Sequence, residues 1–147
     1  IYYAEKQILK TLPKMAKKTD SDALRAAFEA HMVETEGQIE RLEKVFEMAE
    51  LSARGVTCPG INGILEEGKE LMDDTEDPDT MDAGLIASAQ AVEHYEICRY
   101  GTMVAWAKEL GMHEAAKLLQ QTLDEEYGAD RKLSALAEGR LNREAAA

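Results

Sequence analysis

Two glutamates three residues apart, Glu93 and Glu96, lie on or near the apolar face of one helical stretch, AVEHYEICRYG at residues 91–101. Val92 and Tyr100 are among the positions whose spacing marks that face. Burying a carboxylate is costly unless a cation or hydrogen-bond donors pair with it. The two glutamates therefore indicate a site between helices at which a positive charge is expected.

Comparable inward-facing groups occur in three other helical segments. Because each residue turns a helix by about 100°, Glu5 lies inside its apolar stripe and His31 near the centre of the next one. Glu34, one turn after His31, lies on the edge of that stripe. In the last helical segment two acids are central and a third lies on the edge. The candidate metal ligands are thus Glu5, His31, Glu34, Glu93, Glu96, Glu125, Glu126 and Asp130.

A weak internal repeat relates the two halves of the chain. At a single offset without gaps, Glu5 falls on Glu96 and Glu34 falls on Glu125. The repeat favours Glu125 as the ligand from the last helix, whereas the helical phase favours Glu126 and Asp130, so all three remain candidates. One glutamate from each of four helices is the framework of a carboxylate-bridged di-metal site.

The chemistry of such a cluster is that of two divalent cations. Several carboxylates neutralise the four positive charges, and without metal their mutual repulsion would raise their pKa values. Imidazole together with carboxylate suits iron, manganese or zinc better than calcium or magnesium. We expect two divalent metal ions, iron first, with manganese or zinc as alternatives. Four tyrosines could donate hydrogen bonds to the ligands: Tyr2, Tyr3, Tyr95 and Tyr100.

The elements that must position these residues are helices, since no stretch alternates with the period of a strand. We predict an all-α fold, a single ferritin-like domain over 1–147, in which a four-helix bundle has one long crossover with a short fifth helix. Long helices are predicted over about 1–18, 22–49, 81–110 and 113–137, and the short helix over about 61–74. The residues after 137 are predicted to be a polar tail.

Composition narrows the classes of partner. The chain has 29 acidic and 17 basic residues and a net charge of −12, which argues against electrostatic binding of nucleic acid or of an anionic membrane. No segment is apolar enough to span a membrane, and no signal peptide is evident. Cys58 and Cys98 lack metal-binding spacing and are interpreted as reduced thiols. These features favour a cytoplasmic protein.

Four stretches carry a resemblance to a known family. They are IYYAEKQILKTLPKMA, HMVETEGQIERLE, VEHYEICRYGT and LLQQTLDEEYGADRKL, which cover most of the chain. With them the sequence resembles the YciE/YciF family of ferritin-like bacterial stress proteins. The resemblance implies a ferritin-like bundle, a homodimer, a di-metal centre and a stress-response context, but no established reaction.

A wider resemblance is to rubrerythrin and ferritin, and it includes one departure. Glu93-x-x-Glu96 is similar to the ExxE of rubrerythrin's third helix. Sites of that kind usually take an ExxH from the second and fourth helices, whereas here Gly37 and Gly128 stand three residues after Glu34 and Glu125. No ExxH occurs in the chain, so its set of candidate ligands departs from the pattern of those families.

Two functions fit these observations. In the first, a ferritin-like stress-response protein holds a buried carboxylate-rich di-metal site and oxidises Fe(II) or reduces peroxide or oxygen. In the second, a non-enzymatic structural or dimerising protein keeps a vestigial polar core. The sequence leaves open whether the chain is an enzyme. Metal content distinguishes the two functions.

Overall fold

The computed structural model describes residues 1–147, and every regular element is helical. The helices are α1 (Tyr2–Lys18), α2 (Asp22–Met48), α3 (Pro59–Asp74), α4 (Pro78–Glu109), α5 (His113–Leu136), the π-helical turn η1 (Ala137–Leu141) and α6 (Asn142–Ala145). The predicted all-α fold is confirmed: the four long helices form a ferritin-like bundle, and α3 lies in the crossover between α2 and α4.

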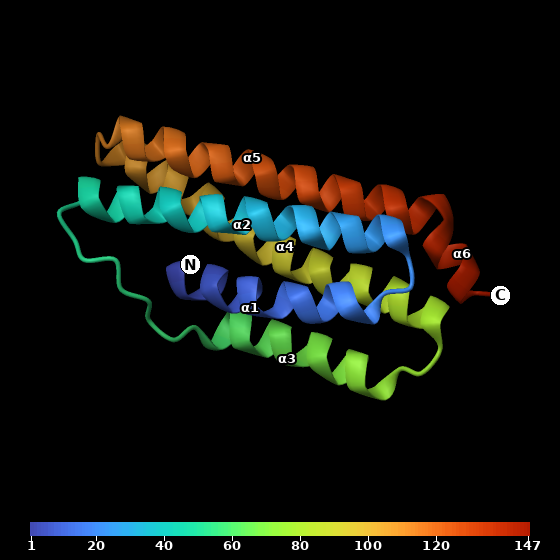
Figure 1. Ribbon diagram of the computed structural model, residues 1–147. Helices are drawn as coiled ribbons and strands as arrows, with labels where there is room; N and C mark the ends of the chain where they lie inside the picture. The colour runs from blue at the N-terminus through green and yellow to red at the C-terminus, as the bar shows by residue number, and fades with distance from the viewer.

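The direction of the helices follows from the connections (Figure 1). α1 and α2 are joined by a tight turn and run antiparallel, as do α4 and α5. The loop of residues 49–58 and then α3 carry the chain back along the bundle, so that α2 and α4 run in the same direction. α3 packs along α1 and α4 and covers one side of the bundle.

Local chemistry fixes the helix ends. The Ser21 side chain accepts a hydrogen bond from the Leu24 backbone N–H at 3.3 Å, and Asp77 accepts one from Thr80 N–H at 2.8 Å. α3 and α4 begin at Pro59 and Pro78, ahead of the predicted starts at 61 and 81. Proline suits this first helical position, because its missing N–H would have no partner there.

The C-terminal segment differs from the predicted polar tail. η1 and α6 continue the helical path of α5, and Leu141 packs into the apolar core with Ala137. Burial of these two side chains, together with the packing of η1 and α6 on α4, accounts for the helical path of the last residues despite their polarity. α2, α4 and α5 each end one residue before the predicted end.

The core has two apolar clusters along the bundle axis. The larger one contains Phe28, Leu85 and Leu133, and the smaller one Leu42, Tyr100 and Leu119. Between them, along each long helix, lie the candidate site residues. The helices therefore hold an ionisable layer between two apolar clusters in the middle of the bundle.

Candidate metal centre

Five ionisable side chains meet at the middle of the bundle. Glu5 comes from α1, His31 from α2, Glu93 and Glu96 from α4, and Glu126 from α5. All five are buried, and Glu5, Glu96 and Glu126 have no exposed surface. Each occupies a position that the helical period turns inward, so the bundle itself brings them together.

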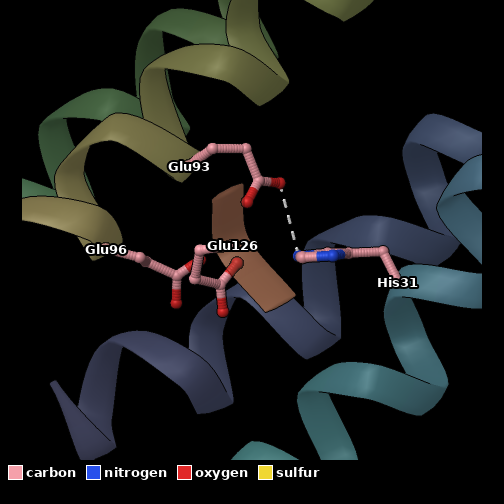
Figure 2. A group of neighbouring side chains, drawn as sticks. All are labelled: His31, Glu93, Glu96 and Glu126. Carbon is pink, nitrogen blue, oxygen red and sulfur yellow. Dashed lines mark ion pairs between the residues drawn. The ribbon is translucent and has the colours of Figure 1, made fainter. Parts of the chain in front are cut away.

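Four of the five form a compact group. His31, Glu93, Glu96 and Glu126 each offer one ligand atom, and these four atoms lie within 4.8 Å of one another. In Figure 2 the His31 imidazole points toward Glu93, while the Glu96 and Glu126 carboxyl groups lie beside each other. The Nε2 atom of His31 is 3.4 Å from Oε1 of Glu93. One nitrogen and several oxygens thus face a common point.

Glu5, on α1, is the fifth ionisable side chain of the layer. The Tyr100 hydroxyl donates a hydrogen bond to its Oε1 atom, and its Oε2 atom has no partner. Of the four tyrosines considered from the sequence, Tyr100 alone bonds to a residue of the cluster. Tyr2, Tyr3 and Tyr95 contact Glu43, Asn62 and Cys58 instead.

The buried polar atoms of the cluster are largely unsatisfied. The atoms without a hydrogen-bond partner are Glu5 Oε2, both imidazole nitrogens of His31, Glu93 Oε2, and both carboxyl oxygens of Glu96 and of Glu126. Buried polar groups are otherwise almost always paired, because an unpaired one costs about 1–3 kcal/mol. So many in one place is the pattern that a bound cation would relieve.

Electrostatics point in the same direction. Burial raises the pKa of Glu5 and of Glu93 to about 7. The pKa of Glu126 is raised to about 10, first by burial and then by its contact with Glu93 and by the charge of Glu93. The pKa of Glu96 is also raised, first by burial and then by the charges of Glu5, Glu126 and Glu93. Without a cation these carboxylates hold protons near neutral pH.

The histidine responds to the same environment. Burial lowers the pKa of His31, but the contact with Glu34 and the charges of Glu126, Glu34 and Glu5 outweigh that effect, and its pKa is raised. The imidazole therefore favours its charged form when the carboxylates around it are ionised.

Three predicted candidates lie outside the cluster. The Arg41 guanidinium pairs with Glu125, and Gln38 Nε2 donates to its Oε2 atom at 3.2 Å. Asp130 accepts from Gln90 at 2.9 Å and lies 3.3 Å from His94 Nε2. On α5 the carboxylate that joins the cluster is thus that of Glu126. The helical phase favoured Glu126 together with Asp130, and the repeat favoured Glu125, but neither Asp130 nor Glu125 belongs to the cluster. For Glu125 the cause is Arg41, a cation on another helix.

Glu34 has an intermediate position. Its Oε2 atom is 3.5 Å from His31 Nδ1, and its Oε1 atom is 3.4 Å from Lys132 Nζ. Its side chain keeps 30 % of its surface exposed, so it links the buried histidine with solvent. Sequence reasoning missed the roles of Arg41 and Lys132. The repeat contained the signal, since at its offset Arg41 falls on Lys132.

Fold and site together define the class: an all-helical ferritin-like bundle with a buried carboxylate–histidine cluster at its centre. A family described as "Domain of unknown function (DUF892)" matches residues 1–146. The chain belongs to this family.

Relatives support the assignment. Over 145 residues the chain is 46 % identical to "Protein YciF" of Escherichia coli (strain K12), covering 98 % of this chain and 87 % of that protein. The crystal structure of the E. coli stress protein YciF superposes with a TM-score of 0.91 at 46 % identity, covering 96 % of this chain and 89 % of the other. The resemblance to the YciE/YciF family is thus confirmed.

A second solved structure is similar to the same degree. YcfI, described as a putative structural protein from Rhodopseudomonas palustris, has a TM-score of 0.89 at 46 % identity, covering 91 % of this chain and 85 % of that one. None of the helices is both long and apolar enough to cross a membrane.

Proposed function

We propose that this chain is a stress-response protein whose central cluster holds divalent metal. The carrying observation is the set of unpaired buried atoms on Glu5, His31, Glu93, Glu96 and Glu126. One imidazole and four carboxylates match the donors that iron, manganese and zinc accept. Two ions are proposed because four carboxylates balance two dipositive charges. Iron is the first choice.

The chain's own residues would perform four tasks around such ions. Glu5, Glu93, Glu96 and Glu126 supply negative charge, and His31 supplies the nitrogen donor. Tyr100 orients Glu5 through its hydroxyl. The apolar clusters at both ends exclude water from the layer. Iron held there would supply the electrons for reduction of peroxide or oxygen.

Metal analysis tests this function. Protein purified without chelator, or loaded with Fe(II) without oxygen, should contain about two ions per chain, as a di-metal carboxylate site requires. Glu96→Gln should lower that content, whereas Glu67→Gln, at an exposed position on α3, should not. Well below one ion per chain in the wild type would reject the proposal. Peroxide consumption by the loaded protein then tests the redox reaction.

A second candidate function is that of a structural protein with a proton-sharing core. It is favoured by the raised pKa values of Glu93 and Glu126, whose neighbouring carboxyl groups could share protons without any metal. The description of the Rhodopseudomonas palustris relative as a putative structural protein is consistent with it. Thermal stability that is indifferent to metal, in the wild type and in Glu5→Ala, would favour this alternative.

We further propose a cytoplasmic homodimer. Trp106 in the last turn of α4 and Leu110, the residue that follows this helix, are 64 % and 74 % exposed, and such apolar surface suits a second copy. Cys58 and Cys98 are both free thiols, as a reducing compartment favours. The net charge of −12 disfavours nucleic acid as a partner. Trp106→Ser should produce a monomer in size-exclusion chromatography if the patch is the interface.

A further inference from the structure

The boundary between α2 and α5 carries two glutamate–cation pairs that correspond through the repeat. Glu34 on α2 pairs with Lys132 on α5, and Glu125 on α5 pairs with Arg41 on α2. The offset that matches Glu34 with Glu125 also matches Arg41 with Lys132. The two pairs therefore occupy equivalent places in the two halves, and differences between them are informative.

The Glu125–Arg41 pair is held by several hydrogen bonds. The Arg41 guanidinium bonds to the Glu125 carboxylate, and its Nε atom donates to Thr122 Oγ1 at 2.9 Å. Gln38 donates a further hydrogen bond to Glu125. A planar guanidinium held by several bonds fixes this carboxylate away from the cluster.

The Glu34–Lys132 pair is held by a single contact and is exposed to solvent. Lys132 makes one contact with Glu34, at 3.4 Å, and 58 % of the lysine side chain is exposed. A solvated lysine held by a single contact contributes little and exchanges readily. The other oxygen of Glu34 already faces Nδ1 of His31, at 3.5 Å. The carboxylate thus touches solvent on one side and the cluster on the other.

A small cavity connects the same residues. Its volume is about 20 Å³, and Glu34, Lys132, His31 and Glu93 line it together with Phe28. That volume is enough for one water-sized occupant. It lies where a small ion would pass from Glu34 to the first cluster ligands.

A second cavity that reaches the cluster offers a contrast. It also has about 20 Å³ and also touches His31 and Glu93, but the rest of its lining includes Met15, Leu65 and Val92. A cation leaving water loses hydration and needs replacement ligands on its way. Only the first cavity offers such a ligand, the carboxylate of Glu34, ahead of the cluster.

We propose that Glu34 is the entry residue through which divalent cations reach the buried cluster, with Lys132 competing for the same carboxylate. This inference rests on the proposed metal-binding function. An incoming cation displaces the ammonium group from Glu34, is held by its carboxylate, and moves to His31 and Glu93. Arg41 keeps the equivalent residue, Glu125, from doing the same in the other half.

The kinetics of Co(II) uptake test this role. Metal-free wild type, Glu34→Gln, Lys132→Gln and the matched control Glu125→Gln would be mixed with Co(II) in a stopped-flow absorbance experiment. Removing a charge that guides a cation can slow association about tenfold or more. We expect Glu34→Gln to slow loading and release by about that factor with an unchanged Kd. Lys132→Gln should load several-fold faster, and Glu125→Gln at the wild-type rate.

Three outcomes would overturn the inference. One is Glu34→Gln loading at the wild-type rate. Another is a weaker Kd with an unchanged association rate, which would make Glu34 a ligand and not an entry residue. The third is equal slowing in Glu125→Gln, which would reduce the effect to general surface charge. If the wild type binds no Co(II) at equilibrium, the metal-binding function fails as well, so the two failures are distinguishable.

Discussion

The ends and the middle of this bundle are built from the same helices but stabilised differently. At the ends, side chains such as Leu85 and Phe28 are buried among other apolar groups and leave nothing unsatisfied. In the middle, Glu96 and Glu126 are equally buried yet lack hydrogen-bond partners for all four carboxyl oxygens. Burial contributes stability at the ends and costs stability in the middle.

The difference teaches that the middle layer is organised for something other than stability. Replacing buried charged groups by apolar ones is often neutral or stabilising. A bundle under selection for stability alone would continue the leucines through the centre. The stability of the two regions should therefore respond to different variables: that of the ends to packing, and that of the middle to metal and pH.

The largest effect is expected from a cavity at an apolar end. Leu85→Ala should lower the free energy of unfolding by about 2–5 kcal/mol, because a fully buried leucine leaves a void. Urea unfolding with chelator, and again with excess Mn(II), should give the same loss. Val33→Ala, at a 70 % exposed position, is the control and should change little. A loss at Leu85 that depends on metal would contradict the separation of the two regions.

A divalent ion bound at the central cluster should stabilise the folded protein. At a free concentration of 100 times Kd, a bound divalent ion should raise the free energy of unfolding by about 2.7 kcal/mol. The gain should vanish in Glu96→Gln, whose amide keeps the shape but removes the charge. Thermal unfolding with and without Mn(II) measures both. An undiminished gain in Glu96→Gln would place the ion elsewhere.

The metal-free protein should lose stability as pH rises. Glu5 and Glu93 ionise near pH 4.5 when unfolded, but their pKa in the folded protein is about 7. The folded state therefore holds protons that the unfolded state releases. The contribution of these two glutamates to the free energy of unfolding is fully present below about pH 4.5 and is lost as pH rises through 7. One pKa unit corresponds to about 1.4 kcal/mol, so the loss between pH 5 and pH 8 should exceed that value.

Chelated protein in urea at pH 5 and pH 8 gives the measurement. Glu93→Gln removes one of the titrating groups and should shrink the difference. Leu85→Ala changes no ionisable group, so its difference in free energy of unfolding between pH 5 and pH 8 should equal that of the wild type. Greater stability at pH 8 than at pH 5 would show that the carboxylates are ionised and paired even without metal.

Sequence reasoning reached the helical layout and the inward direction of several site residues because both depend on local periodicity. Glu5, His31 and Glu96 face the axis as their helical phase requires. Competition between neighbouring acids on α5 was different. Glu125 and Glu126 are adjacent, and the helical phase and the repeat disagreed about them. The pairing of Glu125 with Arg41, which removes Glu125 from the cluster, depends on how α2 packs on α5.

The helix boundaries show both the use and the limit of local signals. Pro59 and Pro78 are local signals for helix starts, and they mark the observed first residues of α3 and α4. The helical C-terminus carried no such signal, since the packing of Ala137 and Leu141 into the core holds it in place. Contacts between elements, and not propensity, account for what the sequence left open.

The smallest effect is expected where the apolar and ionisable regions meet, at Tyr100. Its ring belongs to the smaller apolar cluster, while its hydroxyl donates to Glu5. Tyr100→Phe keeps the packed ring and removes only the hydrogen bond. The cost at pH 8 should be about 1.5 kcal/mol, the lower end of the range for a hydrogen bond to a charged group, because the acceptor is then ionised.

At pH 5 the Glu5 carboxyl holds its own proton, and the cost of Tyr100→Phe should fall below that at pH 8. Urea unfolding of chelated protein at both values measures the difference. Equal costs at the two pH values would assign Tyr100 to the apolar end alone. A cost confined to pH 8 would show that its hydroxyl serves the ionised Glu5, as a residue that prepares a carboxylate to receive a cation should.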